Sequence, residues 1–148
     1  MASATDRSGV ARILRMALVL SVLVYPLVAS LVLGPPKWRA PWIPSEQDKA
    51  ILLVALGILA LGEFVAGWLV GSLRRPPRFM AATADPAAFG FVRFIIALAL
   101  IESGALFGLV GSFVTQDPRY AITFAVPAVL LMLQVPGVKP PGAADSQW

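Results

Sequence analysis

Two glutamates stand inside long apolar runs of this sequence, where ionisable side chains are rare. Glu63 lies in the run that ends before Arg74, and Glu102 lies in the run that follows Arg93. At ~1.5 Å per residue along a helix, each glutamate lies roughly 14–16 Å from the nearer of these arginines, about half the thickness of a hydrocarbon layer of ~30 Å. Both carboxyl groups are therefore expected near the middle of a membrane and at a similar depth.

A carboxyl group at this depth needs either a proton or a partner. On insertion scales, a charged carboxylate at the bilayer centre costs at least ~2.5–3.5 kcal/mol. No lysine or arginine stands at the same depth in the apolar runs, so we expect at least one of the two carboxyls to be protonated at neutral pH. A group that takes and releases a proton there is what a proton relay needs. The competing interpretation is a neutral carboxylic acid that hydrogen-bonds to a neighbouring helix and serves packing alone.

The composition indicates that these groups lie in a membrane protein. Of the 148 residues, 58% are hydrophobic and 14% are charged, and the mean hydropathy is +0.80. Soluble domains typically carry about 25% charged residues. The absence of cysteine and histidine excludes disulfides, cysteine or histidine metal sites and catalytic sets that pair a nucleophile with histidine. We expect no enzymatic activity, no metal and no cofactor.

Four apolar blocks predict an all-α integral membrane bundle of four transmembrane helices. The spans are expected at about residues 13–33, 50–73, 94–114 and 120–135, with a cytoplasmic N-terminal tail at 1–12, the transmembrane domain at 13–135 and a disordered tail at 136–148. The blocks are continuous rather than alternating, which argues against strands. The first block is longer than a signal-peptide core and is interpreted as a retained span. The last block is short for a crossing that takes ~20 residues.

A capping sequence marks the start of the second helix. Ser45 precedes Glu46 and Asp48, which is the pattern of an N-cap serine followed by acids in the first turn.

The basic residues predict the orientation of the spans. With four spans, both tails and the middle loop lie on one side and carry eight of the 12 lysines and arginines. The positive-inside rule then places both termini in the cytoplasm of a multi-pass protein of a bacterial-type inner membrane. Basic residues that flank spans favour lipid headgroups as partners over nucleic acid.

Four glycines form two pairs at the spacing that lets helices approach closely. Gly67 and Gly71 form the first pair, and Gly104 and Gly108 form the second. Such small-xxx-small patterns predict helix packing. The same faces are candidates for contacts with copies of this chain or with other membrane subunits.

The segment Glu102–Val110, ESGALFGLV, resembles the second helix of the proteolipid (c) subunit of rotary ATP synthases. That family places small residues, an aliphatic–aromatic pair and Gly-Leu-Val after the acid, and it joins a glycine-rich helix to the acidic helix through a basic loop, here with Arg75-Pro76. The resemblance covers about residues 50–114 and implies that Glu102 corresponds to the ion-carrying carboxylate. The glycine spacing of the first helix, the two flanking spans and the second acid, Glu63, depart from the family. Otherwise the sequence resembles small bacterial multi-span membrane proteins.

These observations predict a small polytopic inner-membrane protein that handles protons or cations through Glu102, with Glu63 as the second candidate. The alternative is a non-catalytic structural or assembly protein whose buried glutamates serve helix packing.

Overall fold

The structure, a computed structural model, describes residues 4–34, 45–73 and 86–137. Within these ranges it contains four helices and no strand: α1 (Ala4–Leu33), α2 (Glu46–Ser72), α3 (Pro86–Thr115) and α4 (Arg119–Gln134). The predicted all-α bundle is confirmed. By length and composition, α1, α2 and α3 could each cross a membrane, whereas α4 has 16 residues and is shorter.

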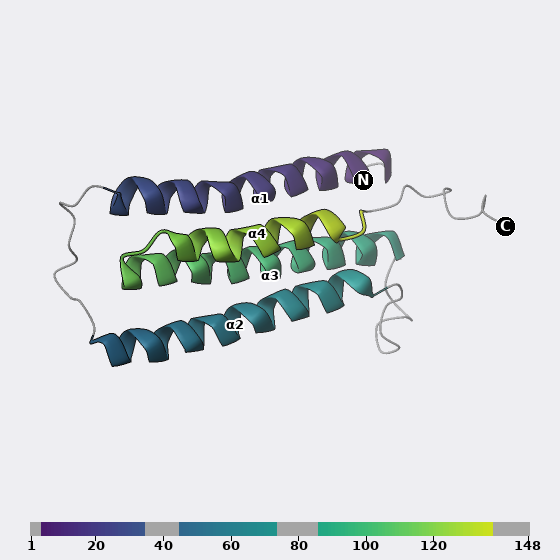
Figure 1. Cartoon of the computed structure of the whole chain (residues 1–148). Helices are drawn as coiled ribbons and strands as arrows, with labels where there is room; N and C mark the ends of the chain where they lie inside the picture. Colours follow the sequence, from purple (N-terminus) through teal and green to yellow (C-terminus); the bar gives the residue numbers. More distant parts are fainter. Residues whose placement is uncertain (1–3, 35–44, 74–85, 138–148) are drawn as a thin grey trace.

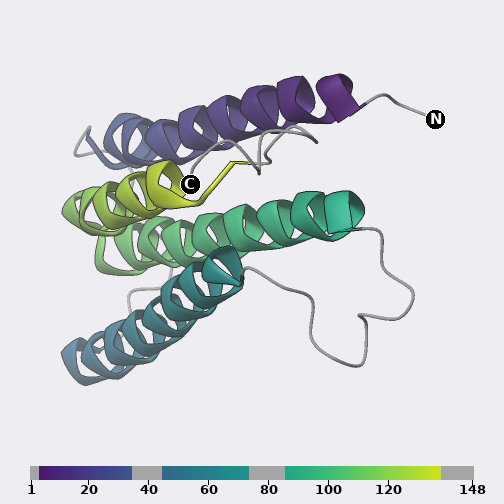
Figure 2. The same ribbon diagram turned by 90° about the vertical axis from the view of Figure 1, so that its right-hand side faces the viewer.

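Helix α3 is the centre of the bundle (Figures 1 and 2). Helices α1 and α4 pack along it on one side and α2 packs on it from another, whereas α1 and α2 make no contact with each other over the described residues. Successive helices run in opposite directions, so that the start of α1, the end of α2, the start of α3 and the end of α4 share one end of the bundle. Arg15 and Arg93 lie toward this end, which we call the arginine end.

Three helices begin several residues before the apolar blocks from which their spans were predicted. Helix α1 begins at Ala4, so most of the predicted N-terminal tail is helical, and α2 and α3 begin at Glu46 and Pro86. Hydropathy marks where side chains can contact lipid, whereas backbone hydrogen bonds continue a helix through polar residues. The bounds of α4 agree with prediction to within one residue. Most of the predicted disordered tail, from residue 138 onward, lies outside the described residues.

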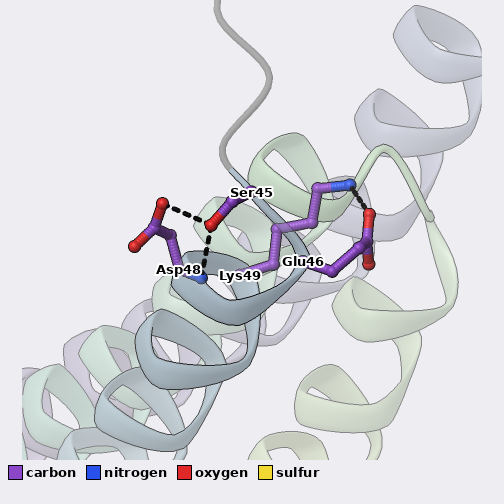
Figure 3. Close-up of polar contacts among 4 residues, drawn as sticks. All are labelled: Ser45, Glu46, Asp48 and Lys49. Carbon is purple, nitrogen blue, oxygen red and sulfur yellow. Dashed lines mark hydrogen bonds and ion pairs between the residues drawn. The ribbon is translucent and has the colours of Figure 1, made fainter.

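The predicted cap of α2 is confirmed (Figure 3). The Ser45 hydroxyl oxygen accepts a hydrogen bond from the backbone N–H of Asp48 at 3.1 Å, and the Ser45 hydroxyl donates to the Asp48 carboxylate at 2.6 Å. Lys49 forms an ion pair with Glu46 at 2.6 Å. Acids in the first turn also interact favourably with the positive end of the helix dipole.

Replacing Ser45 with alanine is expected to lower the free energy of unfolding by about 0.5–2 kcal/mol, because the substitution removes the side-chain acceptor for a first-turn N–H. Reversible unfolding in mixed micelles, followed by circular dichroism, measures this change. The matched control is Gln47→Ala at the exposed neighbouring position. Equal stability of the two variants would contradict the capping role.

Small residues bring the helices together around α3. The four glycines predicted to pack, Gly67, Gly71, Gly104 and Gly108, are all buried. A β-carbon at Gly67 would lie 2.7 Å from the Ile101 side chain, whereas one at Gly71 would find ordinary contacts at 3.5 Å. Close backbone approach is therefore required at some of these positions and not at others.

A buried serine joins α3 to α4. Ser112 has no exposed surface. Its hydroxyl donates to the Gly108 carbonyl at 3.1 Å and accepts from the Ala121 backbone N–H at 2.7 Å. Because Pro118 at the N-cap of α4 forms no side-chain cap, Ser112 supplies the missing acceptor from the neighbouring helix.

At the arginine end, arginine side chains from neighbouring helices donate hydrogen bonds to the C-cap carbonyls of α2 and α4. Arg15 on α1 donates to the carbonyl of Val135, the C-cap of α4, and its guanidinium lies 5.1 Å from the centre of the Phe94 ring. Arg93 on α3 donates to the carbonyl of Leu73, the C-cap of α2. Cations are favourable at helix C-termini, where carbonyl groups lack helical partners. Helix α4 therefore reaches the level of Arg15 in spite of its length of ~24 Å.

Candidate functional site

Glu102 lies in the middle of α3 and directs its carboxyl group toward α1. Oε1 accepts hydrogen bonds from Ser21 Oγ at 2.8 Å and from Tyr25 Oη at 2.9 Å. The two hydroxyl oxygens are 3.2 Å apart. Residues four apart share one face of a helix, so α1 presents both hydroxyls to the same carboxyl oxygen. We call these three side chains the Glu102 cluster.

The Glu102 cluster lies well inside the bundle, away from the arginine end. Glu102 follows Arg93 by roughly 14 Å along α3, and Tyr25 follows Arg15 by roughly 15 Å along α1. The three side chains of the cluster are partly buried. No lysine or arginine forms an ion pair with Glu102 in the described part of the chain, and hydroxyl groups take the place of a cation.

The hydrogen bonds of the Glu102 cluster suit both protonation states of the carboxyl group. Each hydroxyl carries one proton: Tyr25 can donate to Oε1, and Ser21 can donate either to Oε1 or to Tyr25 Oη, with Oε1 as the shared acceptor of the cluster. Oε2 is then the oxygen that can carry a proton. An ionised carboxylate and the carbonyl oxygen of a carboxylic acid both accept hydrogen bonds, so Ser21 and Tyr25 can keep their places when the proton leaves or returns.

Glu63 lies at a similar depth but belongs to a different interface. Its neighbour Phe64 occupies the space beside Gly104, which places Glu63 within about one helical turn of Glu102 along the bundle. Glu63 comes from α2, whereas Glu102 is bonded to α1, and no hydrogen bond joins the two carboxyls among the described residues. Glu63 Oε2 is buried and has no hydrogen-bond partner within the described ranges. Glu63 and Glu102 therefore lie at a similar height along the bundle, but their carboxyl groups are not paired with each other.

Sequence reasoning missed Ser21 and Tyr25. Their spacing of four residues in the first apolar block was a usable signal, since it places two hydroxyls on one helical face at the depth predicted for Glu102. Hydropathy does not say which helix lies beside which, and it could not assign α1 as the neighbour of the carboxyl face of α3.

No cluster of acidic side chains in the described ranges could hold a metal ion.

Comparison with known proteins finds no matching family model, no similar curated protein and no similar solved structure. The resemblance of the Glu102 segment to the proteolipid subunit therefore stays a prediction. Ser21 and Tyr25 lie outside residues 50–114, which carry that resemblance.

Proposed function

We propose that this protein is a small multi-pass protein of a bacterial-type inner membrane that moves protons through Glu102. The observation that carries the proposal is the Glu102 cluster, a mid-bundle carboxyl group whose two neighbours are hydroxyls rather than a fixed cation. Ionisable residues at such depth are functional candidates by default, and a carboxyl without a counter-cation can exchange a proton. The resemblance to the proteolipid subunit adds an independent reason to place the role at Glu102.

The geometry favours a proton over a metal cation as the species that is handled. The Ser21 and Tyr25 hydroxyl oxygens lie 2.8 and 2.9 Å from Oε1, within the usual range for O–H···O hydrogen bonds. A bound cation requires the hydroxyl lone pairs, not their protons, to point inward. Binding of a cation would therefore require the cluster to reorganise, whereas proton exchange at Oε2 would not.

The orientation and partners in this proposal follow from charge and packing. Both termini lie in the cytoplasm, because the tails and the middle loop carry most of the basic residues. Glu63 is the second candidate on a proton path, because its buried Oε2 has no hydrogen-bond partner among the described residues. Copies of this chain or other membrane subunits are the candidate partners.

The second candidate function is structural. The two hydrogen bonds of Glu102 join α1 to α3, and interhelical bonds of this kind contribute ~0.6 kcal/mol on average. In that case, the carboxyl serves only as an acceptor that holds two helices together.

The variant Glu102→Gln separates the two functions. The glutamine carbonyl can still accept both hydroxyl hydrogen bonds, so the stability of the bundle is expected to remain close to that of the wild type. Because a side-chain amide does not take up or release a proton near neutral pH, proton movement through the protein is expected to stop. The measurement is acidification of liposomes that contain the purified protein and an internal pH dye, driven by a potassium diffusion potential.

The control is Glu46→Gln, which makes the same chemical change at the exposed start of α2 and should leave proton movement unchanged. Carbodiimide labelling read by mass spectrometry provides a second readout, with modification expected at Glu102 and not at Glu46. Proton movement that persists in Glu102→Gln would refute the proposal. So would wild-type liposomes no more permeable to protons than protein-free ones.

A further inference from the structure

An open apolar groove runs between α2 and α4. It has a volume of about 540 Å³, and its lining consists of Leu61, Phe64, Val65 and Trp68 from α2 and Pro127, Leu130, Leu131 and Gln134 from α4. Figure 2 shows α2 diverging from the other helices along its length. The groove lies toward the end of α2 that is nearer to the other helices, and apolar side chains of α2 and α4 line it.

A second, smaller hollow with a more polar lining adjoins the groove where α2 and α4 end. This hollow of about 140 Å³ shares Trp68 and Gln134 with the groove and adds Ser72 and Val135 to its lining. Both shared residues lie toward the C-terminal ends of their helices, so the hollow lies at the arginine end. The smaller hollow, which we call the mouth, therefore adjoins the groove and has the more polar lining of the two.

Two partly buried arginines lie beside the mouth and contact backbone carbonyls of its lining or of the residue next to it, without lining the mouth themselves. Arg15 donates to the carbonyl of Val135, which lines the mouth, and Arg93 donates to the carbonyl of Leu73, which follows the mouth residue Ser72. In both arginines, Nε is buried and has no hydrogen-bond partner among the described residues. A guanidinium has five N–H donors, so the terminal N–H groups of the two arginines, rather than the buried Nε, would serve an anionic group at the mouth.

We propose that the α2–α4 groove is a binding site for an anionic phospholipid, with one acyl chain in the apolar part and the phosphate at the arginine end. The chemistry changes along the groove as it changes along a lipid, from hydrocarbon to a negative headgroup. Basic sites between transmembrane helices bind anionic headgroups by the same charge complementarity.

The charges of α2, α3 and α4 favour a lipid over a second copy of the chain. Within the described parts of these helices and their connections, three acids lie at the end opposite the arginines: Glu46, Asp48 and Asp117. The other two, Glu63 and Glu102, lie in the middle. A copy that inserts α2, α3 or α4 in the same orientation brings none of these acids to Arg93, whereas an anionic headgroup supplies negative charge at that level.

Trp68 lines both the groove and the mouth and can report their occupant. The chain has four tryptophans, and Trp38→Phe, Trp42→Phe and Trp148→Phe together leave Trp68 as the single fluorophore. This protein is placed in phosphatidylcholine vesicles that contain a fixed minor fraction of phosphatidylglycerol, with bromine on the acyl chains of one lipid or the other. Brominated phosphatidylglycerol is expected to quench Trp68 more strongly than its share of the lipid predicts, with a preference per lipid molecule of roughly five-fold for each arginine that contacts the headgroup.

Arginine variants test whether the preference for phosphatidylglycerol depends on the charge at the mouth. Arg93→Gln is expected to lose most of the preference for phosphatidylglycerol, and Arg93→Lys is expected to retain it because the charge remains. Arg12→Gln makes the same change of charge on an exposed part of α1 and should leave the preference unchanged. If Arg93→Gln does not fold, Val65→Phe carries the test, because a larger side chain should fill the groove and reduce quenching by phosphatidylglycerol.

Quenching by each brominated lipid in simple proportion to its share of the vesicle lipid would overturn the proposal. An equal loss in Arg12→Gln and Arg93→Gln would also overturn it, since the preference would then reflect general surface charge. Protection of Trp68 from both lipids, together with cross-linking of chains through the α2–α4 face, would identify a second copy as the occupant instead.

Discussion

Replacing Gly108 with alanine is expected to destabilise the bundle by about 1–3 kcal/mol, because the added methyl group has no space between α3 and α4. A β-carbon at this position would lie 2.4 Å from Phe124 Cβ and 3.0 Å from the Tyr120 carbonyl oxygen. Both atoms are tied to the backbone of α4, so the helix itself must move. At Gly104 the clash is with the ring of Phe64, which can rotate, and the cost should be smaller.

Gly62→Ala is the matched control for Gly108→Ala. A β-carbon at Gly62 in α2 meets nothing within 4 Å, and alanine is favoured over glycine in a helix by up to ~1 kcal/mol. This variant should therefore be as stable as the wild type or more stable. Unfolding in mixed micelles at increasing denaturant fraction measures both changes. A Gly108→Ala protein as stable as Gly62→Ala would show that α3 and α4 do not approach as closely as described.

Replacing Ser112 with alanine is expected to cost about 1–3 kcal/mol, because it leaves the buried N–H of Ala121 without an acceptor. The N-cap of α4, Pro118, has no side chain that could replace it. Amide hydrogen exchange should accelerate at Ala121, and α4 should separate from α3 at lower denaturant than in the wild type.

The control for Ser112→Ala is Thr123→Ala. Thr123 is exposed on α4, and its hydroxyl donates only within its own helix, to the Arg119 carbonyl at 3.0 Å. Loss of this local bond leaves no buried donor without an acceptor, so the effect on stability should be small. If the two variants lose similar stability, Ser112 does not serve as the cap of α4.

The proposed function and the lipid groove depend on different parts of the bundle. The Glu102 cluster lies between α1 and α3, whereas the groove lies between α2 and α4. Glu102→Gln should therefore leave the quenching of Trp68 by phosphatidylglycerol unchanged, and Arg93→Gln should leave the Ser21 and Tyr25 hydrogen bonds in place. The two proposals can fail independently.

The sequence by itself determined the helical class of the chain, the position of each helix and the relative level of the two acids. Apolar blocks located the four helices of the described ranges, because a helix able to cross hydrocarbon needs a long uninterrupted apolar run, which α1, α2 and α3 have. The cap at Ser45 and the similar level of Glu63 and Glu102 follow from local chemistry and from the constant rise of a helix. Each of these properties depends on residues near one another in the chain.

Only the tertiary structure decided which side chains meet. It assigned Ser21 and Tyr25 to Glu102, separated Glu63 from that cluster and made Ser112 the cap of α4. In transmembrane segments nearly every face is apolar, so hydropathy does not distinguish a face that contacts lipid from one that contacts a helix. The choice of neighbour depends instead on close packing and interhelical hydrogen bonds between residues distant in sequence, and these exist only once the helices have assembled.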